Sequence, residues 1–491
     1  KNFEMNSAAG GAKSGDDHSI RKQSEAHVHQ HSRVSQLILE KRCIACHDLG
    51  QDNASIATVD YRAEMSAPNL TSVSNRFSAE FLIRKILDPD FEQHDASMPS
   101  LLRPEDANSK QVAANITEYL RTVDENHHPK NQPATEITDK TVATGEQLFE
   151  QLGCIGCHHL PIDNSKDRFN RISLKFTGQK FSPSGLRSFL KDPHEHFPFR
   201  RMGNFALNDR EANALASFIT KYSSKAISTK ESFPFGDAKL GREQFISVGC
   251  ANCHQVSGEK LLPQMSKLSS LKAGCLSSSD KISQTGIPEF DLADAEKEMI
   301  AKVIAEIDQN NFNEKKSMTT LLSKTPKWKQ TSLITQSLRC NACHSVDEKS
   351  ASLPEIIYEE GVVGLNPERL PNIGQVGNKL HTQWMQELFA GNSKAPSRPW
   401  LKTRMPAFGG YAKSLAHGLT NQAGIDHDAA IPSTNVAPAE LKIGQQLLSQ
   451  NQGLDCRQCH GIGNEPPRGD DKTQIVLGVN FSESKKRIRK E

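Results

Sequence analysis

The feature that most constrains this chain is a short pattern of cysteine and histidine that occurs five times. Ten of the eleven cysteines lie in it, and each copy reads Cys-x-x-Cys-His. The copies occupy residues 43–47, 154–158, 250–254, 340–344 and 456–460. With this composition, chance would produce about 0.009 copies per chain. The folded chain must therefore present two thiols and an imidazole together at five separate places.

Two thiols three positions apart on a tight turn can reach both vinyl groups of one haem, and the histidine that follows can bind the iron. The pattern therefore predicts five covalently attached haem c groups, each with its iron. The predicted attachment residues are Cys43, Cys46, Cys154, Cys157, Cys250, Cys253, Cys340, Cys343, Cys456 and Cys459. The predicted proximal iron ligands are His47, His158, His254, His344 and His460.

Three other kinds of site use cysteine pairs: a structural zinc site, a disulfide and a thioredoxin-like redox pair. Zinc ribbons bring two Cys-x-x-Cys pairs together across about 15 to 20 residues. Here successive pairs are roughly 90 to 115 residues apart, and a histidine follows every one. This spacing favours haem over the other three kinds of site.

The sequence around the motifs also repeats. Similar segments that open amphipathic helices precede three motifs, at residues 145–149, 241–245 and 444–448. A Pro-Asn block follows the first and fourth motifs, at residues 68–70 and 371–373. Methionines stand on short loops further along the chain. We interpret three of them as distal iron ligands: Met98, Met202 and Met405.

In this order of elements the units resemble class I cytochrome c domains, which are small all-α folds that hold haem between a histidine and a methionine. The resemblance covers most of residues 33–491 apart from linkers, and it extends to large multihaem cytochromes of environmental bacteria. It implies an all-α tandem array of five cytochrome c-like domains joined by polar linkers. The expected units are a polar tail or remnant of a preceding region at 1–26, and domains at 27–124, 141–222, 239–310, 328–418 and 440–491.

Two units depart from this pattern. Aligning residues 201–207 with 286–292 puts Ile287 at the methionine position, so the third haem is expected to be five-coordinate or ligated from elsewhere. The same unit contains Cys275, for which burial as a small apolar side chain is favoured over a role as a thiolate ligand. The fifth unit ends at Glu491, before a second helix and methionine loop, and is expected to be either truncated or open on one haem face.

Charge and hydropathy argue against several functions. The chain has 60 Lys and Arg against 58 Asp and Glu, which gives no electrostatic basis for binding nucleic acid or an anionic membrane surface. No run approaches the ~18 consecutive apolar residues of a membrane span, so no transmembrane segment is expected. Apolar residues make up 36% of the chain, which is thin for several small cores, and each porphyrin would add apolar surface.

The resemblance implies electron transfer between a redox donor protein and a redox acceptor protein, neither of which the sequence identifies. It also implies a periplasmic or other extracytoplasmic location, because haem c is attached after export. Two alternatives stay open: a peroxidase-like or small-molecule-reducing haem enzyme that uses the third haem as its open site, and the electron-acceptor module of a larger dehydrogenase. No catalytic residue is predicted.

Overall fold

The computed structural model describes most of the chain. The described residues are 30–43, 67–71, 73–91, 98–123, 137–160, 167–223, 232–256, 274–277, 286–307, 327–346, 350–362, 370–392, 402–426, 436–450, 453–469, 478 and 480–489. Helices dominate them, which confirms the helical fold class in its broad form. None of the described helices is both long and apolar enough to cross a membrane.

The helices are mostly short. Those before residue 250 are α3 (Val73–Arg76), α4 (Ala79–Leu87), α5 (Ala107–Thr122), α6 (Asp139–Gln151), α7 (Thr177–Lys180), α8 (Pro183–Lys191), α9 (Asp209–Ser223) and α10 (Ala238–Ser247). Those after it are α11 (Asp294–Ile307), α13 (Lys327–Ser337), α14 (Leu353–Glu359), α15 (Val376–Lys379), α16 (Thr382–Phe389), α17 (Ala412–Gln422), α18 (Pro438–Leu448) and α19 (Phe481–Arg487). A further helical segment occupies residues 30–40.

Single turns and one small sheet complete the secondary structure of the described residues. The 3-10 turns are η3 (Cys154–Gly156), η4 (Cys250–Asn252), η5 (Gly274–Leu276), η7 (Cys340–Ala342), η8 (Gly409–Tyr411) and η9 (Cys456–Gln458). Strands β1 (His158–His159) and β2 (Ile172–Ser173) pair in parallel. Equivalent serines cap two of the helices: Ser78 accepts a hydrogen bond from the backbone of α4, and Ser182 does the same for α8.

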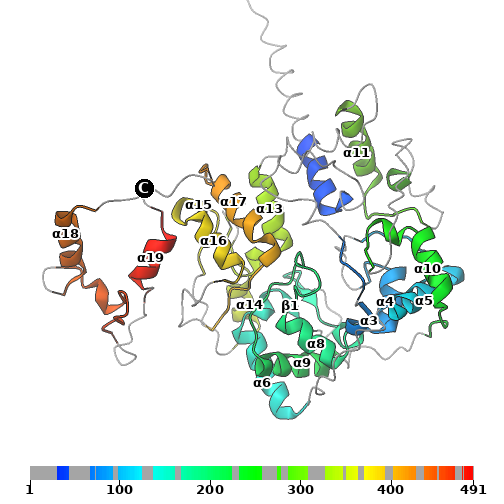
Figure 1. Cartoon of the computed structure of the whole chain (residues 1–491), viewed down its shortest axis with the longest axis horizontal. Helices are drawn as coiled ribbons and strands as arrows, with labels where there is room; N and C mark the ends of the chain where they lie inside the picture. Colours follow the sequence, from blue (N-terminus) through cyan, green and yellow to red (C-terminus); the bar gives the residue numbers. More distant parts are fainter. Residues whose placement is uncertain are drawn as a thin grey trace, which may run out of the picture.

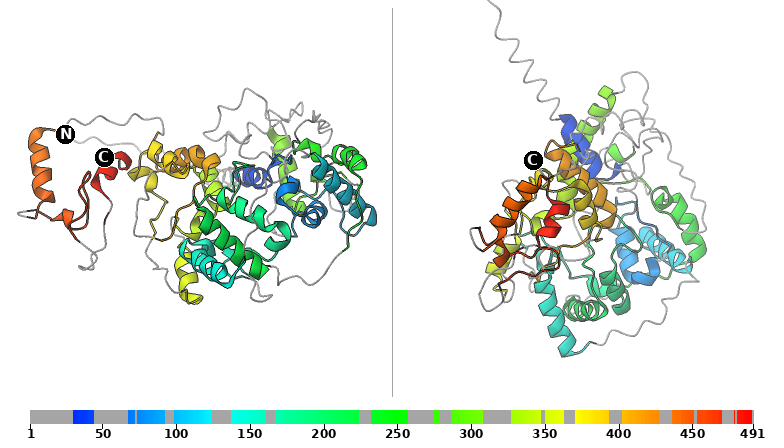
Figure 2. Two further views of the ribbon diagram at one scale, coloured as in Figure 1. Left: turned by 60° about the horizontal axis from the view of Figure 1, so that its bottom comes forward. Right: turned by 60° about the vertical axis from the view of Figure 1, so that its left-hand side comes forward.

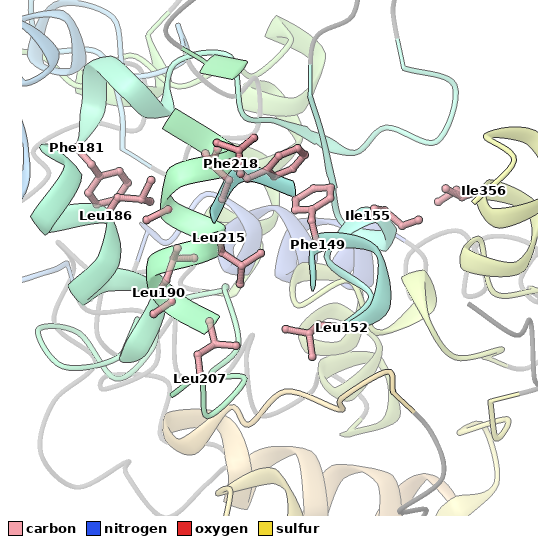
Figure 3. Close-up of a cluster of buried hydrophobic side chains, with 14 of the residues drawn as sticks. Phe149, Leu152, Ile155, Phe181, Leu186, Leu190, Leu207, Leu215, Phe218 and Ile356 are labelled. Carbon is pink, nitrogen blue, oxygen red and sulfur yellow. The ribbon is translucent and has the colours of Figure 1, made fainter. Parts of the chain in front are cut away.

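Helices α6 and α9 cross at a glycine. A Cβ atom at Gly145 would lie 2.1 Å from the carbonyl oxygen of Ala214, so only glycine lets the two backbones come this close. One turn further along, the rings of Phe149 and Phe218 meet with centroids 5.6 Å apart. Both rings belong to an apolar cluster that fills the space between α6, α8 and α9 (Figure 3). This crossing joins the two ends of residues 137–223.

A second crossing has the same geometry but joins distant parts of the chain. Helix α10 crosses α5 at Gly241, where a Cβ atom would lie 1.9 Å from the carbonyl oxygen of Asn115. Phe245 and Tyr119 meet beside it with ring centroids 5.6 Å apart, and Asn115 donates its side-chain amide to Gln244 at 3.0 Å. The two helices come from segments that the sequence assigns to the first and third domains.

The remaining ends of those two segments also pack together. The helical segment 30–40 and α11 share an apolar cluster formed by Val34, Leu37, Ile38, Leu39, Leu292, Ile300, Val303 and Ile304. Arg33 forms an ion pair with Glu296 across this contact at 2.7 Å. The described contacts therefore interleave the two segments, and each supplies a helix to the core of the other.

We name five lobes after the motif that each carries. Lobe 1 combines the described residues of 30–43, 274–277 and 286–307, and lobe 3 combines those of 67–123 and 232–256. Each of the other lobes comes from one stretch of the chain: lobe 2 from 137–223, lobe 4 from 327–426 and lobe 5 from 436–489. Lobes 1 to 4 lie close together, whereas α18 and α19 of lobe 5 stand to one side (Figure 1, Figure 2).

Two further apolar contacts connect lobe 4 to its neighbours. Its helix α14 contributes Leu353 and Ile356 to the cluster of lobe 2, and Figure 3 shows Ile356 approaching this cluster from outside lobe 2. Its helix α13 places Leu333 and Ile334 against the cluster of lobe 1. Lobe 4 therefore packs on the apolar cores of both lobe 1 and lobe 2.

Short antiparallel bridges of two kinds also join neighbouring lobes. In the first kind, residues after the Pro-Asn block pair with their equivalents: Phe77 of lobe 3 with Phe181 of lobe 2, and Leu380 of lobe 4 with Ile488 of lobe 5. In the second kind, residues of the methionine loops or their equivalents pair: Ser100 with Glu289, and Asn204 with Ala407. The bridges therefore connect lobes 1 and 3, 3 and 2, 2 and 4, and 4 and 5.

Candidate haem-attachment sites

In lobes 2 to 5 each motif begins with one tight turn. The first three motif residues form η3, η4, η7 or η9, and the amide of the second cysteine donates to the carbonyl of the first at 3.1 to 3.3 Å. In lobes 3, 4 and 5 the histidine amide donates to the same carbonyl at 2.9 to 3.0 Å. A helical turn brings residues i, i+3 and i+4 to one side. Both thiols and the imidazole are therefore directed to a common face.

The residue before every motif has a left-handed backbone. The φ values are 53° at Arg42, 85° at Gly153, 96° at Gly249, 56° at Arg339 and 52° at Asp455. This conformation ends the preceding helix and turns the chain into the motif. Three of these residues are not glycine, so the turn that follows must hold them in a strained conformation.

The first cysteine in lobes 1 to 4 lies at an apolar cluster. Cys43, Cys154, Cys250 and Cys340 each contact the core of their own lobe. Burial raises the pKa of each of these thiols to about 12. A neutral thiol next to apolar side chains suits a thioether bond to a porphyrin, whose flat apolar face such a cluster can contact. The surroundings of these first cysteines therefore fit a covalently attached haem.

Three of the motif histidines, His158, His254 and His344, have surroundings that suit iron binding. The Nδ1 atoms of His254 and His344 lie 2.9 Å from the carbonyl oxygens of Pro68 and Pro371, to which they donate. This bond fixes the tautomer in which Nε2 carries the lone pair. Burial also lowers the pKa of His158, to about 4, so its imidazole is neutral at physiological pH.

Lobe 5 holds its motif histidine by packing. The ring of Phe481 stacks on His460 with centroids 4.3 Å apart. On the Gly478 side, a Cβ atom would lie 2.3 Å from the imidazole, so only glycine fits there. The amide of Gly478 donates to the carbonyl of Cys459 at 2.7 Å. The chain after this motif therefore folds back onto it.

Two predicted residues of the first motif, Cys46 and His47, lie outside the described residues. In the third motif, Cys253 is disulfide-bonded. A disulfide and a thioether cannot share one sulfur, so haem attachment through both cysteines of this motif requires Cys253 to be reduced. Within the described ranges, no group of three or more His, Cys, Asp or Glu side chains is placed to hold a metal ion.

The three predicted distal methionines differ in exposure. Met202 is partly buried and packs on the same cluster as Cys154, and His194 is hydrogen-bonded through Nε2 to its carbonyl oxygen at 2.8 Å. Met98 is also partly buried. Met405 is 45% exposed. Of the three, Met202 is the one that packs on the same apolar cluster as the first cysteine of a motif, Cys154.

The loop bridges place these methionines and Ile287 at equivalent positions. Ser100 and Glu289 exchange backbone hydrogen bonds at 3.0 and 2.9 Å, and Asn204 and Ala407 do so at 2.8 Å. Each bridging residue lies two positions after Met98, Ile287, Met202 or Met405. The alignment that put Ile287 at the methionine position therefore agrees with the register of the two bridges.

The loops of lobes 2 and 4 carry further contacts that the sequence did not predict. Arg404 makes a bidentate ion pair with Glu211, at 2.5 and 3.0 Å. Tyr411 donates its hydroxyl to the carbonyl of Phe199 at 2.9 Å. No motif or spacing marks these residues, because each contact joins residues about 200 positions apart.

The motifs of lobes 2 and 4 lie next to each other. A Cβ atom at Gly156 would lie 3.7 Å from the Cys343 sulfur. Burial, together with the proximity of Cys157, raises the pKa of Cys343 to about 12. The second cysteine of one motif is therefore close to that of the other.

Cys275 lies in lobe 1. Its side chain is partly buried, and burial raises the pKa of its thiol. It is near enough to Cys43 to contribute to the raised pKa of that thiol, and the next residue, Leu276, packs on the lobe 1 cluster. These surroundings agree with a small buried side chain.

Comparison with protein-family models, with curated proteins and with solved structures finds no match to this chain.

Proposed function

We propose that this chain transfers electrons between redox partner proteins outside the cytoplasm, through five covalently bound c-type haems. The observation that carries the proposal is the meeting of the motifs of lobes 2 and 4, at Gly156 and Cys343. Thioether bonds at these motifs would bring two haems close to each other. Because the rate of electron tunnelling falls steeply with the gap between haem edges, neighbouring attachment sites favour transfer between them.

The roles of the side chains follow from their positions. A bound haem would supply an iron that gains and loses one electron. His254 and His344, each held by a proline carbonyl, would present Nε2 to that iron. Met202, whose loop is tied to His194, would fill the sixth position of the second haem. Ligation by histidine and methionine raises the reduction potential and leaves no open site, which suits electron transfer.

The bridges suggest how electrons would pass through the chain. Lobe 1 contacts lobe 3, lobe 3 contacts lobe 2, and lobe 2 contacts lobe 4. Lobe 4 contacts lobe 1 again through α13. Lobe 5 is attached to lobe 4 through Ile488 and through Arg489, whose guanidinium donates to the Leu380 carbonyl at 2.8 Å. We propose that four haems share electrons within one group and that the fifth exchanges them with this group through lobe 4.

One observation supports a second candidate function. Ile287 stands at the methionine position in its loop, and its side chain cannot bind iron. A haem that faces it would keep an open coordination site, as a peroxidase-like or small-molecule-reducing enzyme requires. The four other haems would then supply that site with electrons.

Intact-mass measurement of the chain, produced together with a periplasmic haem-attachment system, tests haem binding. We expect five covalent haems in the natural chain, four after Cys154→Ser with Cys157→Ser, and five after Cys275→Ser. Fewer than five in the natural chain would contradict the proposal. Potentiometric titration should then show five one-electron steps, whereas rapid peroxide turnover would favour the enzyme.

A further inference from the structure

We infer that Met98 is the distal ligand of the haem at the third motif, and that Ile287 faces the haem at the first motif. Among the first four haems, the first instead of the third is then the one without a methionine. This inference rests on the proposed haem binding. It follows from the interleaving of lobes 1 and 3. Each of these lobes combines two separate stretches of the chain, so the residues on the two faces of its haem need not come from the same sequence repeat.

The proximal side of the third haem is built by residues that follow the first motif. His254 donates from Nδ1 to the carbonyl of Pro68, and the amide of Leu70 donates to the carbonyl of the residue after His254, both at 2.9 Å. Lobe 4 provides an internal standard, because the same two bonds join His344 to its own Pro371 block, also at 2.9 Å. The block at residues 68–70 therefore serves the third motif.

The distal side shows the same exchange. In lobe 2 the standard arrangement puts Phe205, three residues after Met202, in the cluster that contains Cys154. The equivalent residue after Met98 is Leu101, which packs on the cluster of Cys250. The equivalent residue after Ile287 is Phe290, which packs on the cluster of Cys43. The loop of Met98 therefore belongs to the third motif, and the loop of Ile287 to the first.

The helices that frame each pocket agree with this assignment. Helix α5, which closes the loop of Met98, crosses α10, which leads directly into the third motif. Helix α11, which closes the loop of Ile287, packs on the helical segment 30–40, which leads into Cys43. The bridge between Ser100 and Glu289 then holds the two loops side by side, as it does the loops of lobes 2 and 4.

A count of methionine-ligated haems tests the assignment in the full chain. The measured signal is the methionine-to-iron absorption band of the oxidised protein, which does not depend on activity. We expect the loss of one such haem when the third haem is removed by Cys250→Ser with Cys253→Ser, and no loss when the first is removed by Cys43→Ser with Cys46→Ser. In the variant that carries Cys250→Ser and Cys253→Ser, Met98→Ala should cause no further loss of methionine-ligated haem. Any other combination would overturn the assignment.

A cross-linking measurement tests the interleaving without haem chemistry. Arg33→Lys keeps the charge opposite Glu296, so a carbodiimide should join the two side chains by an amide that mass spectrometry can locate. Arg121→Lys beside Glu118, which lie 2.8 Å apart within α5, is the matched control because that link forms in any arrangement. If the control cross-link forms and the cross-link between residues 33 and 296 does not, the inference is refuted. If the chain bound no haem, the proposed function would fail while this measurement stayed decisive about the fold.

Discussion

The crossing of α5 and α10 offers a sharp test through Gly241→Ala. The new methyl group would lie 1.9 Å from the Asn115 carbonyl oxygen and 3.0 Å from the amide nitrogen of Ile116. Ordinary van der Waals contact begins near 3.4 Å, and both obstacles are backbone atoms of a helix. The two helices must therefore separate by about 1.5 Å, which also parts Phe245 from Tyr119.

The cost can be worked out from three contributions. Overpacking at a tight contact costs about 1 to 3 kcal/mol, and a weakened aromatic pair costs about 0.5 to 1.5 kcal/mol. Alanine recovers about 0.5 to 1 kcal/mol, because it orders more easily in a helix than glycine. Together these contributions give a net loss of about 0.5 to 4 kcal/mol in lobe 3. At ~2 kcal/mol, near the middle of this range, the open population of its helices rises roughly 30-fold.

Hydrogen exchange in the full chain, read by mass spectrometry, measures this locally. Amides of α5 and α10 should exchange faster in the Gly241→Ala variant, while those of α6 and α9 stay unchanged. Gly444→Ala in α18 is the control, because no atom lies within 4 Å of its Cβ position, and it should slow exchange there. Faster exchange in α11 with unchanged α5 would refute the crossing, since α10 would then pack on α11.

Two further predictions concern lobes 2 and 4. Burial by itself would raise the pKa of Glu211, but Arg404 and the backbone amide of Asn208 together outweigh burial and hold this pKa below its ordinary value. The ion pair contributes about 0.5 to 1 kcal/mol. This stabilisation is present above about pH 4.3 and is lost as the pH falls through the lowered pKa. Arg404→Gln should therefore weaken the acid sensitivity of hydrogen exchange in both loops. Met202→Ala should remove one methionine-to-iron band, whereas Met385→Ala, which costs about 2 to 5 kcal/mol in the core of lobe 4, should remove none. An unchanged band count after Met202→Ala would exclude this ligand.

Much of each site is local and could be expected from its motif. The turns of η3, η4, η7 and η9 depend on hydrogen bonds between residues three and four positions apart, so neighbouring residues suffice to specify them. The equivalence of Ile287 with Met202 and Met405 was also visible by alignment, because α9, α11 and α17 each begin seven residues after these positions. The backbone bridge between Ser100 and Glu289 then showed that the loop of Met98 and the loop of Ile287 lie side by side.

The partners of these local elements were not predictable in the same way. The pattern in α10 shows that the face with Gly241 and Phe245 is buried, but it does not say against which helix. Helix α5 offers the backbone carbonyl of Asn115 and the ring of Tyr119 to that face, as α9 offers Ala214 and Phe218 to α6. Repeated units carry near-equivalent faces, so exchange between units preserves the same contacts.

The sequence by itself determined the chemistry available at each motif, the helical class of the described residues and the position at which one methionine is missing. Each depends on residues close together in the chain. Only the tertiary structure decided that Pro68 and Leu101 lie with the third motif, that the motifs of lobes 2 and 4 meet, and that Arg404 binds Glu211. These are contacts between faces of similar shape and polarity, and the packing of the whole chain selects among them because it must bury all of them at once.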